Sequence, residues 1–126
     1  MDTAMEQKQK LILVIDDDRI VHKLLTHLFT ENGYAVNSLM DATQTVETVK
    51  SVSPDLIILD LSMPHISGFD VLKLLFENNI HTPVIVLSAT SQAHNVEYVL
   101  DLGARYFVPK PFKKEFLLQK VKDLIG

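Results

Sequence analysis

The chain of 126 residues contains no cysteine. Disulfide bonds and thiolate metal sites are therefore excluded, which leaves oxygen ligands open as a way to hold a hard cation. The absence of cysteine also fits a reducing compartment. The sequence has no internal repeat, no low-complexity stretch and no linker. Its 47% hydrophobic residues are enough to bury the core of one globular domain, without room for a second.

Long apolar runs and runs of basic residues are missing as well. No hydrophobic stretch approaches the ~20 residues needed to cross a bilayer, and the polar start lacks the apolar centre of a signal peptide. The 12 basic and 16 acidic residues are dispersed, which argues against direct binding of nucleic acid. We expect a cytoplasmic protein without membrane insertion, with a flexible tail at residues 1–10 and one domain at residues 11–126.

What the chain does contain is an alternation of short apolar runs with amphipathic segments. The apolar runs, rich in Ile, Val and Leu, are residues 11–15, 34–38, 55–60, 83–88 and 105–109. Continuous apolar strands that alternate with helical patterns are typical of parallel sheets covered by helices on both faces. The sequence therefore predicts an α/β domain with a single doubly wound parallel sheet of five strands.

Apolar residues at spacings of three and four predict the inner faces of the helices. For the first, fourth and last helices these residues are Ile20, Val21, Leu24, Leu25 and Leu28; Ala93, Val96 and Leu100; and Phe116, Leu117, Val121 and Leu124. The expected helix caps and stops are Asp18, Gly33, Asp41, Thr90 or Ser91, and Gly103. Two histidines, His22 and His27, are assigned to the polar side of the first helix, while His81 and His94 are placed outside the crevice.

Polar residues stand at the ends of four of the predicted strands. Asp16 and Asp17 follow the first strand, Asp60 ends the third, Ser88 ends the fourth and Lys110 follows the fifth. The carboxyl ends of parallel strands border the ligand crevice of such folds, so these side chains should meet there. Two like charges about 4 Å apart repel by roughly 4 kcal/mol at an effective dielectric near 20. The carboxylates therefore predict a site for a divalent cation.

These residues, with their neighbours, resemble a response regulator receiver domain over nearly the whole chain. The motifs that carry the resemblance are Val14-Ile15-Asp16-Asp17, Asp60 with Met63-Pro64 and Gly68, Ser88-Ala89, and Lys110-Pro111-Phe112. Each motif alone is weak, but their joint spacing is specific. The resemblance implies a flavodoxin-like (βα)5 fold with strand order 2-1-3-4-5. It also implies a cis peptide bond between Lys110 and Pro111.

The resemblance further implies a phosphoacceptor of a two-component or phosphorelay system rather than an enzyme. Asp60 would accept a phosphoryl group from a phosphohistidine on a histidine kinase or histidine phosphotransfer protein. Ser88 and Lys110 would bind the phosphoryl oxygens. Mg²⁺ would compensate the charge. Its implied ligands are Asp16 acting through water, Asp17, Asp60 and the backbone carbonyl of Ser62.

In this family an aromatic residue near the lysine moves when the acceptor is phosphorylated, and Phe107 has the matching position. Phe107 is either this switch residue or an ordinary core residue. A downstream protein is expected to bind the face formed by the fourth helix, the fifth strand and the fifth helix. Tyr98, Phe107 and Leu118 mark this face, unless Tyr98 and Leu118 merely border the core. We expect a monomer or a phosphorylation-dependent dimer, either standing alone or part of a longer regulator.

Two other readings of the sequence stay open. A haloacid-dehalogenase-like phosphatase would use Asp16 as nucleophile and Asp18 as general acid, but this leaves Asp60 and its neighbours unexplained. An unphosphorylated interaction module is the second, although Asp17, Asp60 and Lys110 are all present. In the receiver reading Gly68 is a turn residue with positive φ. His65 either influences access of phosphate or is a surface residue of the loop.

Overall fold

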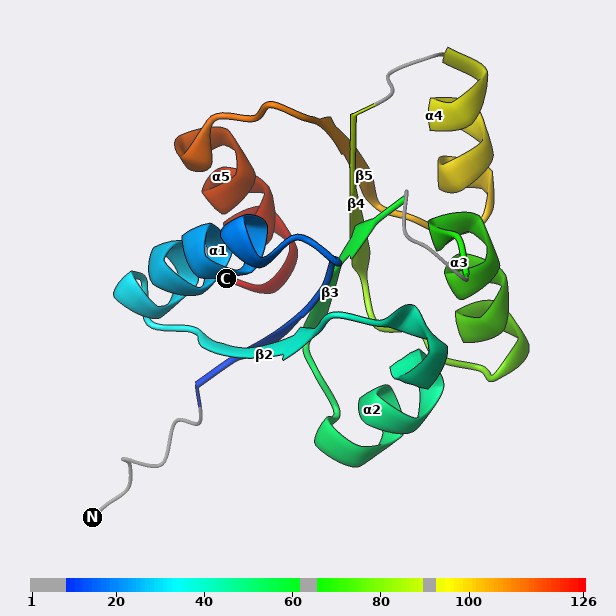
Figure 1. Ribbon diagram of the computed structural model, residues 1–126, viewed down its shortest axis with the longest axis horizontal. Helices are drawn as coiled ribbons and strands as arrows, with labels where there is room; N and C mark the ends of the chain where they lie inside the picture. The colour runs from blue at the N-terminus through cyan, green and yellow to red at the C-terminus, as the bar shows by residue number, and fades with distance from the viewer. Residues whose placement is uncertain (1–8, 62–65, 90–92) are drawn as a thin grey trace.

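The structure is a computed structural model that describes residues 9–61, 66–89 and 93–126 (Figure 1). Five parallel strands form one sheet in the order β2-β1-β3-β4-β5. The strands are β1 (Leu11–Ile15), β2 (Ala35–Leu39), β3 (Leu56–Asp60), β4 (Val84–Ser88) and β5 (Tyr106–Pro109). This order confirms the predicted fold class and the strand order that the resemblance implied.

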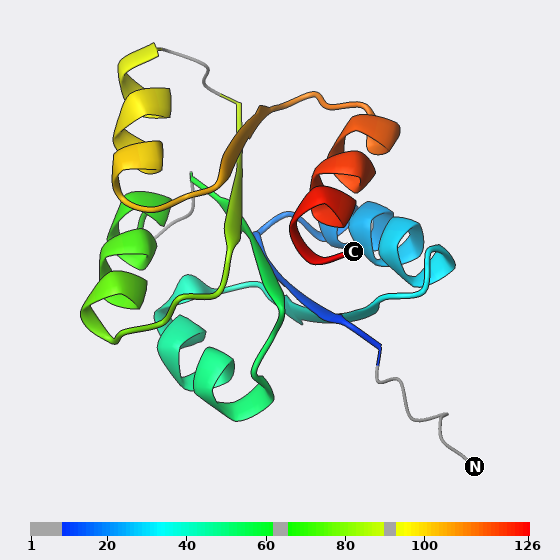
Figure 2. The same ribbon diagram turned by 180° about the vertical axis from the view of Figure 1, so that it is seen from behind.

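Helices cover both faces of the sheet, as Figures 1 and 2 show. They are α1 (Arg19–Glu31), α2 (Thr45–Val52), α3 (Gly68–Glu77), α4 (Ala93–Asp101) and α5 (Lys114–Ile125), with a short 3₁₀ turn, η1 (Ala42–Gln44), before α2. Helices α1 and α5 lie on one face, and α2, α3 and α4 lie on the other. Every side chain of β3 is buried because each face of this central strand is covered.

The register of the strands aligns the polar residues at one edge of the sheet. Ile15 lies opposite Leu59, so Asp16 and Asp60, the next residues, come side by side. Ser88 lies opposite Pro109, which brings Lys110 just beyond the end of β4. The carboxyl ends of four strands therefore meet where the sequence predicted the crevice.

The predicted inner face of α1 agrees only in part with the observed one. Leu25 and Leu28 are buried as predicted, and Phe29 is buried beside them. Ile20 and Leu24, however, are 77% and 38% exposed. His22, expected on the polar side, is buried as well. Residues 22, 25 and 29 have the same spacings of three and four as the predicted stripe. Periodicity alone therefore did not decide which of two neighbouring rows faces the sheet.

Similar differences occur in α4 and α5. Leu100 and Phe116, both expected on inner faces, are 42% and 48% exposed. Val99 is buried in α4 instead, whereas Leu117 and Val121 of α5 are buried as predicted. The apolar rows are wider than the strips of helix that the sheet covers, so residues at their borders remain in contact with solvent.

The helix ends agree with most of the predicted caps. The Asp18 carboxylate accepts a hydrogen bond from the backbone N–H of Ile20 at 2.8 Å and caps α1. Asp41 caps η1 rather than α2. Gly33 and Gly103, which follow α1 and α4, have φ angles of 89° and 110°, as expected for residues that end helices. The caps expected at Thr90 or Ser91 lie outside the described residues.

Candidate functional site

Three carboxylates meet at the carboxyl edge of the sheet. Oxygens of Asp16, Asp17 and Asp60 all lie within 4.8 Å of one another. Asp16 and Asp60 are 1% and 5% exposed, whereas Asp17 faces solvent. Among the predicted magnesium ligands, these three are therefore brought together by the fold. Ser62, the fourth, lies outside the described residues.

Lys110 pairs with two of the three carboxylates. Its Nζ atom lies 3.2 Å from Asp16 Oδ2 and 3.4 Å from Asp60 Oδ1. Partial burial by itself would lower the pKa of Lys110, but the charges of Asp16 and Asp60 and their hydrogen bonds outweigh it, so the pKa is raised. One ammonium group does not balance three carboxylates, and the donor set is made only of oxygen. The cluster therefore fits a small divalent cation such as Mg²⁺.

The backbone around Lys110 is held against β4. Its N–H donates a hydrogen bond to the carbonyl of Ser88 at 2.7 Å. The Lys110–Pro111 peptide bond is cis, as the resemblance implied. Ser88 is fully buried at the end of β4, one strand away from Asp60. The hydroxyl and ammonium groups expected to bind phosphoryl oxygens thus lie on the β4–β5 side of Asp60.

Asp16 is held at each of its polar groups. Its N–H donates to the carbonyl of Leu39 at 3.1 Å, and its Oδ1 accepts from the N–H of Asp18 at 2.9 Å. Its Oδ2 contacts Lys110, and its carbonyl accepts a hydrogen bond from Nε2 of His22. Sequence reasoning missed His22, although this residue shares a helical row with Leu25 and Phe29.

Gly68 has a different role from the one predicted. Its φ angle is not positive, so Gly68 does not form the expected left-handed turn. Instead, an added Cβ would lie 2.8 Å from Leu61 Cα and 2.9 Å from the carbonyl oxygen of Asp60. The Gly68 N–H donates to the carbonyl of Leu61 at 2.9 Å. Glycine is required because α3 begins in direct contact with the backbone that follows Asp60.

The residues predicted to form the output face differ in exposure. Tyr98 is 43% exposed and its ring lies 5.3 Å from that of Phe69, measured between centroids. Phe107 is half-buried and packs against the core formed with α2, α3 and α4. Leu118 is also half-buried, against the core formed with α1 and α5. Tyr98 is thus the most accessible of the three. His65 lies outside the described residues.

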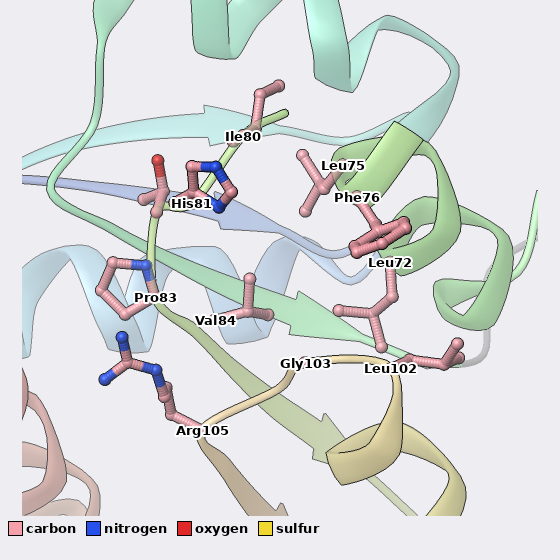
Figure 3. Close-up of a pocket in the computed structure, with 11 residues that line it drawn as sticks. Leu72, Leu75, Phe76, Ile80, His81, Pro83, Val84, Leu102, Gly103 and Arg105 are labelled. Atoms are coloured by element: carbon pink, nitrogen blue, oxygen red, sulfur yellow. The ribbon is translucent and has the colours of Figure 1, made fainter. Parts of the chain in front are cut away.

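A cavity of about 240 Å³ opens at the opposite, amino edge of the sheet (Figure 3). Leu72, Leu75 and Phe76 of α3 line one side of it, and Pro83 and Arg105 line the other. Because β4 and β5 run away from this cavity toward Ser88 and Lys110, it takes no part in the acidic site.

Fold and site together define a flavodoxin-like α/β protein with an acidic crevice at the carboxyl edge of its sheet. The sequence matches the family model of the response regulator receiver domain over residues 12–122. The chain belongs to this family. Members are signalling phosphoacceptors rather than enzymes in the usual sense, they generally bind Mg²⁺ at an acidic pocket, and they interact with histidine kinases and downstream targets.

Curated relatives include two mycobacterial response regulators. Response regulator MprA of Mycobacterium ulcerans is 36% identical over 114 residues, which are 90% of this chain and 49% of the relative. MprA of Mycolicibacterium vanbaalenii is 35% identical over the same shares. The chain thus spans about half the length of these relatives.

Solved structures agree in fold. The receiver domain of the Francisella response regulator 1452 has a TM-score of 0.87 and 32% identity, covering 92% of this chain and 96% of that one. Vibrio cholerae chemotaxis protein CheY4 has a TM-score of 0.86 and 23% identity, covering 94% and 100%. In the part of the chain that the structure describes, no helix is both long and apolar enough to cross a membrane.

Proposed function

We propose that Asp60 accepts a phosphoryl group and that residues 11–126 act as a phosphorylation-controlled switch. The observation that carries the proposal is the position of Asp60 on the central strand. Asp16 and Asp17 lie on its β1 side, where they can hold a cation, and Ser88 and Lys110 lie on its β4–β5 side. The negative charge of a phosphoryl group bound to Asp60 would therefore be compensated from both sides of β3.

In the proposed reaction a carboxylate oxygen of Asp60 attacks the phosphorus of a phosphohistidine. An O–P bond forms as the N–P bond breaks, and the electron pair returns to the histidine nitrogen, which takes up a proton. A carboxylate is a weak nucleophile, so positioning and charge compensation supply most of the rate. Bound Mg²⁺ would neutralise charge on the phosphoryl oxygens. Asp17, Asp60 and the Ser62 carbonyl would hold it, with Asp16 acting through water.

Lys110 and Ser88 would then bind the new phosphoryl group. In the unphosphorylated state the Lys110 ammonium group lies against Asp16 and Asp60. Addition of a dianionic group to Asp60 would draw the ammonium toward a phosphoryl oxygen. Ser88 would donate its hydroxyl hydrogen to another oxygen, which pulls the loop after β4 toward the site. Phe107, on the neighbouring strand and only half-buried, would move inward into the vacated space.

For the phosphoryl donor we propose a histidine kinase or a histidine phosphotransfer protein. For the output we propose a downstream protein that binds the face marked by Tyr98, Phe107 and Leu118. Tyr98 would make the first contact, because Leu118 is half-buried in the described structure. Phosphorylation-dependent dimerisation through this face is an alternative use of the same surface.

The test is chemical phosphorylation with acetyl phosphate and Mg²⁺, followed by hydroxylamine trapping and peptide mapping. The label is expected on Asp60, and Asp60→Asn should abolish it. Asp101→Asn, an exposed residue at the end of α4, serves as the control and should be labelled like the wild type. A label on Asp16 with turnover of phosphate esters would support the phosphatase reading instead. Absence of any label would support the unphosphorylated interaction module.

A further inference from the structure

His22 is a buried polar residue that the proposed mechanism does not use. Its side chain is only 7% exposed, between α1 and the loop that follows β1. Nε2 forms a hydrogen bond with the backbone carbonyl of Asp16. A carbonyl oxygen only accepts, so Nε2 must carry the hydrogen and donate it. Nδ1, also buried, has no hydrogen-bond partner among the residues that the structure describes.

This hydrogen bond closes a network over the loop between β1 and α1. The N–H of Asp18 donates to the Asp16 carboxylate at 2.9 Å, and the Asp18 carboxylate accepts from Ile20 at 2.8 Å. The N–H of His22 donates to the carbonyl of Asp18 at 3.1 Å. The imidazole of His22 then returns to the carbonyl of Asp16. Residues 16–22 are therefore fixed to one another as a compact turn.

The carbonyl that His22 contacts belongs to the peptide group joining Asp16 to Asp17. The orientation of this peptide determines where both carboxylates point relative to Asp60. On its other side, Asp16 is held by the bond from its N–H to the carbonyl of Leu39 on β2, at 3.1 Å. With both bonds in place, the acidic pair is positioned before a cation arrives.

A purely space-filling role does not account for the choice of histidine. An apolar residue would cover the same patch of sheet without leaving Nδ1 buried and unpartnered. His27, on the same helix, provides the contrast. Its ring is 71% exposed and pairs with Glu31 at 3.2 Å. Of these two histidines, His22 alone contacts the loop between β1 and α1.

We propose that His22 is a positioning residue of the cation site, holding the Asp16–Asp17 peptide so that both carboxylates are preorganised for Mg²⁺. The inference rests on the proposed function, because it presumes that the acidic cluster binds this ion. Residues that orient metal ligands without touching the metal commonly change affinity by about ten- to a hundredfold when replaced. An effect near the lower limit is expected here, because a backbone carbonyl is held rather than a carboxylate.

The experiment compares Mg²⁺ affinity in four proteins by ¹⁵N–¹H NMR titration. His22→Leu, which keeps the bulk but loses the donor, should bind Mg²⁺ about tenfold more weakly than wild type. His22→Gln, whose amide nitrogen reaches about as far as Nε2, should restore most of the affinity. His27→Leu, the matched control on the same helix, should bind like wild type. Equal affinities in wild type and His22→Leu would overturn the inference.

A second readout needs no metal. In Mg²⁺-free protein, hydrogen exchange at the amides of Asp17 and Asp18 should be faster in His22→Leu than in wild type or His22→Gln. If wild type itself binds no Mg²⁺, the proposed function fails and not merely the role of His22. If His22→Leu does not fold, His22→Asn replaces it, because its shorter amide lacks the reach of Nε2. Unchanged affinity and exchange in His22→Asn would likewise overturn the inference.

Discussion

Gly68 shows how much the site depends on the space around single atoms. An alanine Cβ at this position would lie within 3 Å of the backbone of Asp60 and Leu61, which cannot move as a flexible side chain does. We predict that Gly68→Ala lowers the free energy of unfolding by about 1–3 kcal/mol, as overpacking does. It should also slow phosphorylation of Asp60, because the end of β3 must shift. Urea denaturation and the rate of labelling by acetyl phosphate measure the two effects.

The variant Gly33→Ala tests the effect of backbone conformation in the absence of any close contact. Gly33 has a φ of 89°, and nothing lies within 4 Å of an added Cβ. This variant should lose about 1 kcal/mol because alanine disfavours a positive φ. Its labelling rate should remain that of wild type, since Gly33 precedes β2 at the amino edge of the sheet and the acidic residues lie at the carboxyl edge. A Gly68→Ala protein as stable and as reactive as wild type would contradict the close-contact explanation.

The ammonium group of Lys110 neutralises part of the negative charge of Asp16 and Asp60, which a bound cation would also neutralise. This ammonium lies within 3.4 Å of Asp16 and Asp60, so it repels a second cation there. We predict that Lys110→Met binds Mg²⁺ several-fold more tightly than wild type but accepts phosphate more slowly. Lys122→Met, an exposed change of the same net charge, is the control for both measurements. Weaker Mg²⁺ binding in Lys110→Met would mean that the lysine chiefly holds the carboxylates in place.

At the scale of elements, Asp18 links the end of β1 to the start of α1. Because its carboxylate caps α1, Asp18→Ala is predicted to lower the free energy of unfolding by about 1 kcal/mol. Asp18→Ser, which retains a capping oxygen, should lose much less. Both variants should still be phosphorylated on Asp60, as measured by mass spectrometry of the labelled peptide. Loss of labelling in both would indicate that Asp18 takes part in the chemistry instead.

The elements themselves were largely predictable from the sequence. The bounds of β1 and α1 agree with the predicted runs at 11–15 and 19–31, because turn and capping residues flank both. The proximity of the Asp16, Asp17 and Asp60 carboxylates could be predicted from one rule, that the carboxyl ends of parallel strands border the ligand crevice. The order of the strands could not be read from periodicity and came from the family resemblance.

Other features depend on how the elements pack, which a periodic pattern does not encode. Two adjacent rows of α1 share the same spacing, and the exit of the chain from β1 decides which row faces the sheet. His22 therefore appeared to be a surface residue. Gly68 was correctly identified as a required glycine, but for a turn it does not make. Only the approach of α3 to the Asp60 backbone explains it.

At the scale of the whole molecule, two titratable groups in different regions make the free energy of unfolding depend on pH in the alkaline range. Lys110 lies at the acidic crevice, where neighbouring carboxylates raise its pKa against the opposing effect of burial. Tyr34, which directly precedes β2, has a raised pKa because burial disfavours its charged form. Its ring packs edge-on against Phe29 of α1, with centroids 6.3 Å apart. In both residues the folded state holds the proton more tightly than the unfolded chain does.

The sign of the pH dependence follows from these two shifts. A raised pKa in the folded state gives stability that is fully present below the unfolded pKa, about 10 for tyrosine and 10.4 for lysine. That stability is lost as the pH rises through the folded values. We predict that the unfolding free energy of the Mg²⁺-free protein falls above about pH 10, measured by urea denaturation and circular dichroism. In Tyr34→Phe and in Lys110→Met, the loss of unfolding free energy between neutral and alkaline pH should be smaller than in wild type. An equally steep fall in the double variant would show that other groups carry the alkaline transition.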